Sequence, residues 1–418
     1  MQRLLGPLRR WLGAAVAWTM AQHLAYFGSA WLVSALAGAA AFGEFGQALA
    51  LALIGSLAVS WRLDYAAQLA RREGLAQALF VLAERLCWGM GALVAVSVVL
   101  AWALGKAPAW LLAGGLAVTP LALLLAMAAR QVRVGNVVKA AALRALPALL
   151  MLPLQALLAG GRGPDAVVWS VPLAAWLVWG GLRARAGAAP VGPGVAGFRR
   201  LRRAAGVRWH FVRAEWPSLM LNTAANHGQV LLVGALAGDV AAGAMALALR
   251  LAMLPTSLFA PALADALRAR VVAGRTRGAA RALVARVLPG MAGASVAVHA
   301  LAWVVLPVLC AWFFAPQGRE LVQAARLLLW LGALRLLISP LAFLLAWRGW
   351  VGLNLLGQSL LFAAALGAAW WGVPRGGVPA VAGGYALAAA GVYLGYLWAS
   401  WRALQAGLQG DNRGLSSI

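Results

Sequence analysis

The sequence has 418 residues, of which 64% are hydrophobic and only 11% are charged, and its formal net charge is +25. A soluble domain of this composition would expose far more apolar surface than one core can bury, so a soluble fold is excluded and an integral membrane protein is indicated. The positive charge does not indicate nucleic acid, because the basic residues cluster in the turns between apolar segments instead of forming a nucleic-acid-binding motif.

Apolar segments of about 18 to 25 residues, each long enough to cross a ~30 Å hydrocarbon layer as a helix, recur along the whole chain. We therefore predict an all-α integral membrane protein with about twelve transmembrane helices. Arg3, Arg9 and Arg10 precede a first segment that is too long for the core of a cleaved signal peptide. The predicted spans are residues 13–37, 43–61, 77–104, 109–129, 139–160, 165–183, 217–237, 241–264, 284–314, 321–347, 350–373 and 377–401.

Lysines and arginines are distributed unevenly between the two sides of the predicted membrane. If the N-terminus is cytoplasmic, most of the 35 basic residues lie in the termini and the even-numbered turns. The opposite side holds Lys106, Arg162, Arg319 and Arg375. This is the positive-inside pattern, which predicts a multi-pass protein with both termini in the cytoplasm.

Two stretches of the chain repeat one another. Residues 32–43 (LVSALAGAAAFG) and 232–243 (LVGALAGDVAAG) agree at eight of twelve positions, and each turns from the first span of its half into the second. Because six spans separate them, the halves have the same orientation, related by an axis along the membrane normal. The predicted division is an N-lobe (1–186), a basic cytoplasmic linker (187–213), a C-lobe (214–402) and a cytoplasmic tail (403–418).

A polar stripe runs along the first helix of each half at matching positions. The polar residues of the seventh span fall within an arc of about 80° at ~100° per residue, and the first span carries the same pattern. Polar side chains at bilayer depth face protein or water, so both stripes are predicted to face a cavity, the alternative being hydrogen bonding between helices. His23 and His227 lie off the stripes and are predicted to pack. The stripe residues are Trp18, Gln22, Tyr26 and Ser29 in the first span and Ser218, Asn222, Asn226 and Gln229 in the seventh.

Two arginines are predicted to lie near the middle of the bilayer. Arg250 is about nine residues into its span, or roughly 14 Å at ~1.5 Å per residue, and Arg335 is similarly central in the span 321–347. Arg326 lies nearer the outer end and can reach the headgroups. No Asp or Glu is predicted at the central depth, so the charges favour an anionic substrate and argue against a cation exporter.

The stretch SWRLDYAAQLARREG (residues 60–74) interrupts the apolar pattern after the second span. Its arginines lie in the second cytoplasmic turn, where a membrane protein is expected to carry cations. Asp64 is expected to pair with nearby arginines, as Asp265 would at the corresponding end of the eighth span. Arg62, Asp64 and Asp265 are therefore structural or gating candidates.

Four segments carry a family resemblance: residues 30–50, with an FG-x-F run after a glycine-containing turn; residues 61–69, WRLDYAAQL; residues 130–144, a basic turn; and residues 216–255. They resemble the Wzx-type O-antigen and exopolysaccharide flippases, which are polysaccharide transporters of the multidrug/oligosaccharidyl-lipid/polysaccharide exporter superfamily. The segments lie between residues 30 and 255.

The resemblance implies two pseudo-symmetric six-helix lobes around a central cavity that opens alternately to each side. It implies a bacterial inner-membrane protein, without cofactor, that moves undecaprenyl-diphosphate-linked glycan from the cytoplasmic to the periplasmic leaflet for surface polysaccharide synthesis. The lipid bilayer, a polysaccharide polymerase and chain-length proteins are the expected partners. Arg250 and Arg335 would meet the diphosphate, and the two stripes would meet sugar hydroxyls.

Two other functions are alternatives to the flippase. A multidrug or small-molecule exporter of the same fold would be expected, if its cargo were a cation, to carry a buried acid in the first or seventh span. A membrane glycosyltransferase, polymerase or ligase would need a large outer loop, whereas the predicted outer loops are short. No catalytic residue or metal site is predicted, since both cysteines, Cys87 and Cys310, fall in apolar spans.

Overall fold

The structure is a computed structural model that describes residues 2–68, 70, 72–185, 198–273, 277–314, 318–342, 344–345 and 350–405. All regular structure in these residues is helical, which confirms the predicted fold class. The chain forms two compact units, Met1–Leu247 and Ala248–Ile418, and α8 belongs to both.

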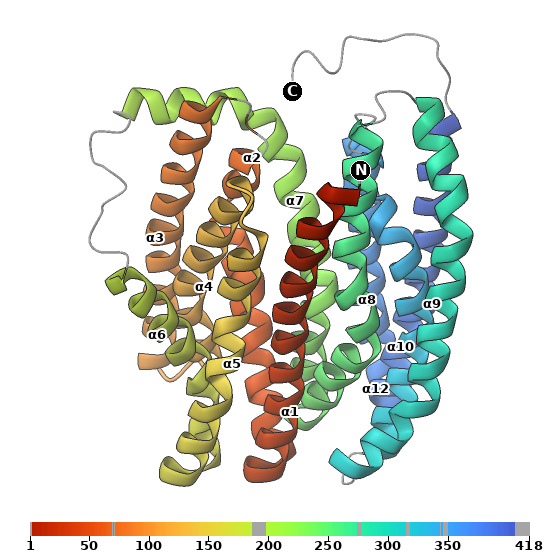
Figure 1. The fold of residues 1–418 in the computed structure, drawn as a ribbon. Helices are drawn as coiled ribbons and strands as arrows, with labels where there is room; N and C mark the ends of the chain where they lie inside the picture. The colour runs from red at the N-terminus through yellow and green to blue at the C-terminus, as the bar shows by residue number, and fades with distance from the viewer. Residues whose placement is uncertain are drawn as a thin grey trace. The chain divides into compact units, whose positions relative to one another are not determined.

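Unit 1 is a bundle of long helices joined mostly by short turns (Figure 1). Its core forms where α4 packs against α1, α3, α5 and α6. Pro217 lies inside α7. The helix bends along its length (Figure 1), because a proline removes one backbone donor from a helix. The elements are α1 (Gln2–Val59), α2 (Leu63–Gln68), α3 (Glu73–Ala103), α4 (Ala109–Arg133), α5 (Val137–Arg162), the 3₁₀ helix η1 (Pro164–Trp169), α6 (Ser170–Arg185), α7 (Phe198–Ala237) and the start of α8 (Asp239–Ala273).

Glycines allow the helices of unit 1 to approach closely. Gly114 of α4 lies against the backbone of Ala48 in α1, and Gly91 of α3 lies against Thr119 of α4. A Cβ at either glycine would overlap these neighbours. Small residues at such contacts are typical of membrane helices, in which close packing replaces the hydrophobic driving force of soluble proteins.

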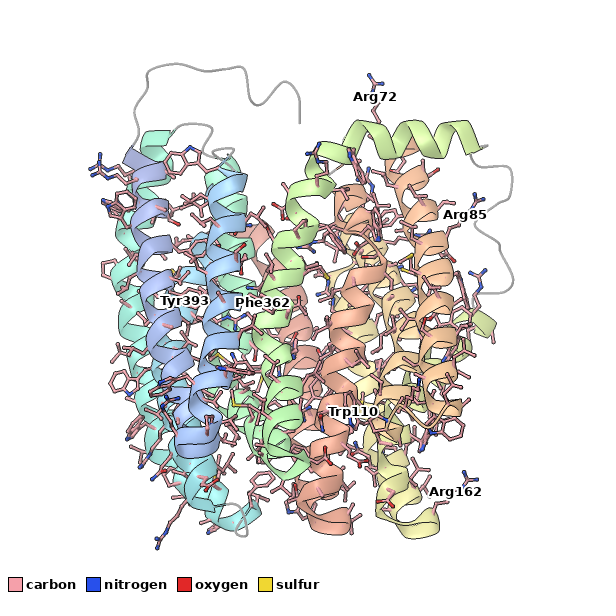
Figure 2. All side chains as sticks on the ribbon, turned by 180° about the vertical axis from the view of Figure 1, so that it is seen from behind. Arg72, Arg85, Trp110, Arg162, Phe362 and Tyr393 are labelled. Atoms are coloured by element: carbon pink, nitrogen blue, oxygen red, sulfur yellow. The ribbon has the colours of Figure 1, made fainter. Side chains whose placement is uncertain are left out.

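Unit 2 contains the rest of α8 together with α9, α10 and α12, which pack against one another. Tyr393 and Phe362 lie on the two legs of α12, at similar heights along it (Figure 2). The elements are α9 (Arg277–Phe313), α10 (Gly318–Ile338), the 3₁₀ helix η3 (Ser339–Leu341) and α12 (Val351–Gln405).

The predicted spans account for the observed helices. Nine helices of the described residues are long and apolar enough to cross a membrane, so the chain is a multi-pass membrane protein. Two of the nine hold two predicted spans each, because α1 is broken at Gly38 and α12 at Gly376 and Gly377. The more polar α7 contains the predicted seventh span, so the described helices accommodate all twelve predicted spans in whole or in part.

The tenth span ends earlier as an α-helix than the sequence predicts. We expected it to run to residue 347, but α10 ends at Ile338 and a 3₁₀ turn follows. Pro340 lies in this turn and has no N–H to donate to the helix. Arg335 therefore lies in the last turn of α10, not at the middle of the helix, and a cation there interacts favourably with the helix dipole.

The division into units differs from the predicted lobe boundary at residues 187–213. Residues 187–197 of that linker lie outside the described residues, as does the tail from residue 406. The packing divides the chain later, after Leu247, because α7 and the first turns of α8 pack against α1. Packing and internal repetition are different properties, so the four-part division remains a prediction.

In unit 1, two arginines that are predicted on opposite sides of the membrane can be compared with their positions in the bundle. Figure 2 shows Arg72 at one end of the bundle and Arg162 at the opposite end, with Arg85 nearer the end that carries Arg72. The prediction assigns Arg72 to the cytoplasmic side and Arg162 to the outer side. The two arginines thus lie at opposite ends of unit 1, as that assignment requires.

Reporter fusions test this topology directly. We expect a fusion within residues 187–213 to report a cytoplasmic location, and fusions next to Lys106 or Arg319 to report the outer side, because the basic turns remain in the cytoplasm. The measurement is paired phosphatase and fluorescent-protein fusions at the same positions. Inverted signals at any of the three positions would contradict the predicted orientation.

Candidate functional site

The first polar stripe lies on the first leg of α1. Gln22 and Tyr26 are half-buried, whereas Ser29 is completely buried, at 0% exposed. The Ser29 hydroxyl has no hydrogen-bond partner among the described residues. A buried polar group without a partner costs about 1–3 kcal/mol, so this hydroxyl is a locally unfavourable feature of the packing.

The second stripe lies on α7 and is hydrogen-bonded along its own helix. Asn226 Nδ2 donates to the Asn222 carbonyl oxygen at 2.7 Å and to Asn222 Oδ1 at 3.1 Å. Gln229 Nε2 donates to the Ala225 carbonyl oxygen at 2.9 Å. Gln229 is also 0% exposed, and its Oε1 accepts no hydrogen bond from the described residues. The stripe therefore ends in an acceptor that is buried and has no donor among the described residues.

The two buried oxygens without donors occupy equivalent positions of the repeat. Ser29 and Gln229 are 200 residues apart, the same offset that relates the two repeated stretches. Helix α1 packs against α7 within unit 1. Hydrogen bonding between these helices alone would be expected to satisfy both groups, because buried polar atoms nearly always have partners. Interhelical hydrogen bonding thus does not account for either oxygen in the described residues, and contact of the stripes with a cavity stays a prediction.

Each repeat forms a helical hairpin, the first from the two legs of α1 and the second from α7 and α8. The two hairpins contact each other close to their turns. Gly43 of α1 lies directly against the carbonyl group of Asp239, the first residue of α8, which leaves no room for a Cβ at Gly43. One turn further along α1, the Gln47 amide donates a hydrogen bond of 2.6 Å to Asp239 Oδ1. Gln47 is 2% exposed, so the contact is closely packed and shielded from solvent.

Residues that correspond in the repeat touch each other in this contact. A Cβ added to Gly243 would lie 3.1 Å from the backbone nitrogen of Gly43, and a Cβ added to Gly46 would lie 3.1 Å from the Cβ of Ala246. In a two-fold arrangement, residues near the axis contact their own equivalents. These pairs therefore mark a pseudo-two-fold axis between α1 and α8, which supports two repeats of the same orientation.

The turns of the two repeats also have the same backbone conformation. Gly38 and Gly238 both have a φ of 86°, which a glycine adopts without the steric penalty of a side chain. Gly38 ends the first leg of α1, and Gly238 separates α7 from α8. The match between these residues strengthens the repeat that the sequence predicts.

The turn after α1 is strained and is held by aromatic packing. Trp61 and Arg62 have positive φ angles of 51° and 61°, which are uncommon for residues with a side chain. The Trp61 ring contacts the rings of Trp209 and Trp216 of α7, with centroid distances of 6.1 and 5.8 Å. Trp216 Nε1 also donates to the Ala58 carbonyl oxygen at 2.9 Å. The turn is thus fixed against α7.

The structure does not show the expected pairing of Asp64 with an arginine in the described residues. Asp64 Oδ1 accepts a hydrogen bond from Ser60 Oγ at 3.2 Å. Arg62 points elsewhere, because the left-handed turn places its guanidinium over the Tyr65 ring, 4.4 Å from the centroid. Glu215 precedes the seventh span, and burial raises the pKa of its carboxyl group. The positive charge of Arg62 lowers the same pKa and so opposes the rise.

A substitution series at Asp64 tests the structural role of this turn. Asp64→Ala is expected to lower the free energy of unfolding by about 1 kcal/mol, since the Ser60 hydroxyl loses its acceptor. Asp64→Asn keeps an acceptor oxygen and should change stability less. The measurements are membrane abundance, thermal unfolding and transport per folded molecule. Normal abundance with abolished transport in Asp64→Asn would make this residue part of the mechanism.

Two ion pairs beside this turn escaped the sequence analysis. Arg133 of α4 pairs with Glu73 at 2.8 Å. The same guanidinium donates to the carbonyl oxygens of Ala67 and Ala70, at 2.9 Å each, and so caps the C-terminus of α2. A second pair links Arg130 of α4 to Glu84 of α3 at 3.2 Å. The available signal was that Glu73, Arg130 and Arg133 lie in or next to neighbouring cytoplasmic turns, whereas Glu84 lies inside the predicted span 77–104.

The arginines of unit 2 have different surroundings. Arg250 of α8 is half-buried and has contacts within the structure. Arg335 lies close enough to Tyr385 to act on it electrostatically. Arg326 packs over the Trp303 ring of α9, 4.9 Å from its centroid, which is a cation–π contact. The side chain of Asp265 lies outside the described residues.

Neither metal ligands nor reactive cysteines gather in the described residues. No group of three or more His, Cys, Asp or Glu residues lies close enough there to hold a metal ion. Cys87 and Cys310 are both free and buried. The candidate residues of unit 1 are therefore the stripes of α1 and α7, and those of unit 2 are Arg250 and Arg335.

Solved structures share this architecture over nearly the whole chain. The chain is similar to an outward-facing multidrug resistance MATE family transporter of the MOP superfamily (TM-score 0.64, 15% identity, 96% of each chain covered). It is also similar to a mutant of the MATE transporter VcmN from Vibrio cholerae (0.57, 17%, 97% of each chain) and to a MOP superfamily transporter from Pyrococcus furiosus (0.58, 14%, 95% of each chain). The chain has the MOP transporter fold.

The MOP fold agrees with the superfamily that the four sequence segments resemble. It does not establish the Wzx-type flippase family, because the similar structures are about 15% identical and several are MATE transporters. No protein-family model matches the chain, and no curated protein matches it by sequence. All of the similar structures described above are transporters, which agrees with the expectation that the chain is not an enzyme.

Proposed function

We propose that this protein is an alternating-access exporter of the bacterial inner membrane and that its cargo is an anionic, amphiphilic molecule. The MOP fold supports export, since it occurs in multidrug resistance transporters in an outward-facing and an inward-facing conformation (TM-scores 0.64 and 0.60). The internal repeat supports alternating access, because two pseudo-symmetric halves can rock about a fixed site.

The position of Arg250 is the observation that carries the choice of an anion. Arg250 lies well inside α8, eleven residues after Asp239. Among the described residues, Asp239 and Glu320 lie in the first turns of their helices, and Glu84, which is deeper in α3, pairs with Arg130. A cation deep in the membrane is retained at a cost that normally reflects function.

A neighbour of the same fold supports a cargo unlike that of cation exporters. The transporter from Pyrococcus furiosus is described as having a binding pocket of reversed polarity, which suggests a different function for that protein. A change of pocket charge within this fold thus has a precedent. In the present chain, the first and seventh predicted spans carry no acid, and Arg250 lies in the eighth.

A specific cargo of this class is undecaprenyl-diphosphate-linked glycan, and the amide stripe favours it as a second candidate. Asn222 and Asn226, which are half-buried, offer amide groups to sugar hydroxyls, and an arginine binds a diphosphate through charge-assisted hydrogen bonds. The lipid tail can remain in the bilayer during transfer. The four segments that resemble Wzx-type flippases support the same cargo.

Transport by vesicles containing the purified protein decides between these cargoes. One assay follows a fluorescent anionic amphiphile, a second follows ethidium as a cationic probe, and a third follows the sidedness of undecaprenyl-diphosphate-linked oligosaccharide. Movement of the anionic dye alone supports a small-molecule exporter, and movement of the oligosaccharide supports a flippase. Movement of ethidium alone would contradict an anionic cargo. Protein-free vesicles provide the baseline.

A further inference from the structure

Unit 2 contains a buried histidine that the proposed function leaves without a role. His299 of α9 is 5% exposed. Its Nδ1 lies 2.8 Å from the carbonyl oxygen of Ser295. Because a carbonyl oxygen only accepts hydrogen bonds, Nδ1 must carry a proton, and Nε2 of the neutral ring then carries a lone pair. The contact with Ser295 thus fixes the tautomer.

The free edge of the ring faces a notch in α10. His299 Nε2 has no hydrogen-bond partner among the described residues. A Cβ added to Gly332 of α10 would lie 2.9 Å from Nε2 and 2.9 Å from the carbonyl oxygen of Ala252 in α8. The imidazole therefore occupies space that only a glycine leaves open. A basic nitrogen buried without a donor requires an explanation beyond packing.

Three helices are joined at this notch by hydrogen bonds to consecutive carbonyl groups of α10. Thr256 of α8 donates through Oγ1 to the Gly332 carbonyl oxygen at 2.8 Å. Ser295 of α9 donates through Oγ to the Ala333 carbonyl oxygen, also at 2.8 Å. If a nitrogen of His299 changes between hydrogen-bond acceptor and donor, the change occurs where α8, α9 and α10 are joined.

Charged neighbours do not account for the state of the ring. The groups that act on it are its apolar surroundings and the Ser295 carbonyl. The charged side chains on the other helices of the junction, among them Arg250 of α8 and Arg326 and Arg335 of α10, are not among those groups in the described part of the chain. The ring is thus not held in one state by a fixed ion pair, whereas its burial in apolar surroundings opposes the charged form.

We propose that His299 is a proton-binding site that couples proton movement to the transport motion, an inference that rests on the proposed function. A proton binds the Nε2 lone pair and converts this nitrogen from an acceptor into a donor. The new N–H then requires an acceptor, and the Ala252 carbonyl group borders the same notch. Protonation therefore changes the hydrogen bonding among the three helices, and loss of the proton restores it.

Nitrogen NMR tests proton binding without any cargo. The chain has only four histidines, so ¹⁵N-histidine protein in nanodiscs gives a small spectrum in which the His299→Phe variant identifies the His299 signals. We expect Nδ1 to be protonated and Nε2 unprotonated near neutral pH, and both to be protonated after titration from about pH 8 to about pH 5. A proton on Nε2 near neutral pH, or no titration in this range, would overturn the proposal.

A transport assay tests the coupling. With the anionic dye in vesicles, wild type should respond to a pH gradient and His299→Phe should lose that response. Cys310→Ala is the matched control: it changes a buried, free side chain of the same helix eleven residues from His299, so it should keep the response. His299→Gln provides a second variant if the Phe variant does not fold.

The two proposals fail in different ways. A full gradient response in folded His299→Phe would show that His299 only packs, because an apolar ring of similar shape then suffices. Titration of His299 in a wild-type protein that moves none of the cargo probes would leave the proton site standing and contradict the proposed function instead.

Discussion

Replacing Arg250 with glutamate is expected to abolish transport of an anionic cargo, because the substitution puts like charge beside the cargo at membrane depth. Arg250→Ala should reduce transport roughly tenfold to a hundredfold, since a hydrogen bond to a charged group contributes about 1.5–3 kcal/mol. Arg250→Lys should restore part of the rate, as a point charge without the planar fork of arginine. The measurement is the vesicle transport rate at matched protein levels.

Insertion of these variants should not account for the loss. An arginine at the centre of a span costs about 2.5–3.5 kcal/mol on insertion scales, so Arg250→Ala should insert as well as wild type or better. Arg326→Ala is the control, because Arg326 packs on Trp303 within the same unit and is assigned no cargo contact. Unimpaired transport by Arg250→Glu would show that Arg250 lies at a packing interface, and would leave Arg335 as the next candidate.

Enlarging Gly43 is expected to disrupt the contact between the two repeats. A leucine side chain there would overlap the carbonyl group of Asp239, which belongs to the backbone and has little freedom to move. Overpacking of this kind costs about 1–3 kcal/mol or more. We expect Gly43→Leu to lower the thermal unfolding temperature and to stop transport, because the two hairpins no longer close on each other.

A glycine elsewhere on α1 provides the control for this effect. Gly13 has no atom within 4 Å of an added Cβ, so Gly13→Leu should leave stability and transport near wild type. Gln47→Ala is a milder probe of the same contact, since it removes the hydrogen bond to Asp239 but keeps the glycine packing. Wild-type unfolding and transport in Gly43→Leu would show that the two hairpins do not need this close approach.

The fold was largely predictable because each membrane span is a local property of the sequence. A helix of about 20 apolar residues satisfies its own backbone hydrogen bonds, so its existence does not depend on distant residues. The spans around α3, α4 and α5 are therefore found close to their predicted bounds. The early end of α10 was less accessible, because Pro340 lies only a few residues inside the predicted limit.

The candidate site was predictable in part. Helical periodicity placed Asn222, Asn226 and Gln229 on one face of α7, and the repeat related Gln229 to Ser29. The burial of those two residues and the absence of donors to their oxygens required the packed structure. His299 was missed because a single histidine in an apolar helix has no periodic or spacing signal, and its significance depends on Gly332 of another helix.

The sequence by itself determined that the chain lies in a membrane, and it gave the number of spans, the predicted orientation and the repeat. Composition, charge and periodicity suffice for these because they act within one helix or between a helix and the lipid. Only the tertiary structure decided which groups meet: that Gly43 lies against Asp239, that Arg62 packs on Tyr65 while Asp64 accepts from Ser60, and that Arg133 caps α2. These contacts join residues far apart in the chain or depend on a strained turn. Their energies arise from close approach and from the exclusion of solvent, which no local pattern specifies.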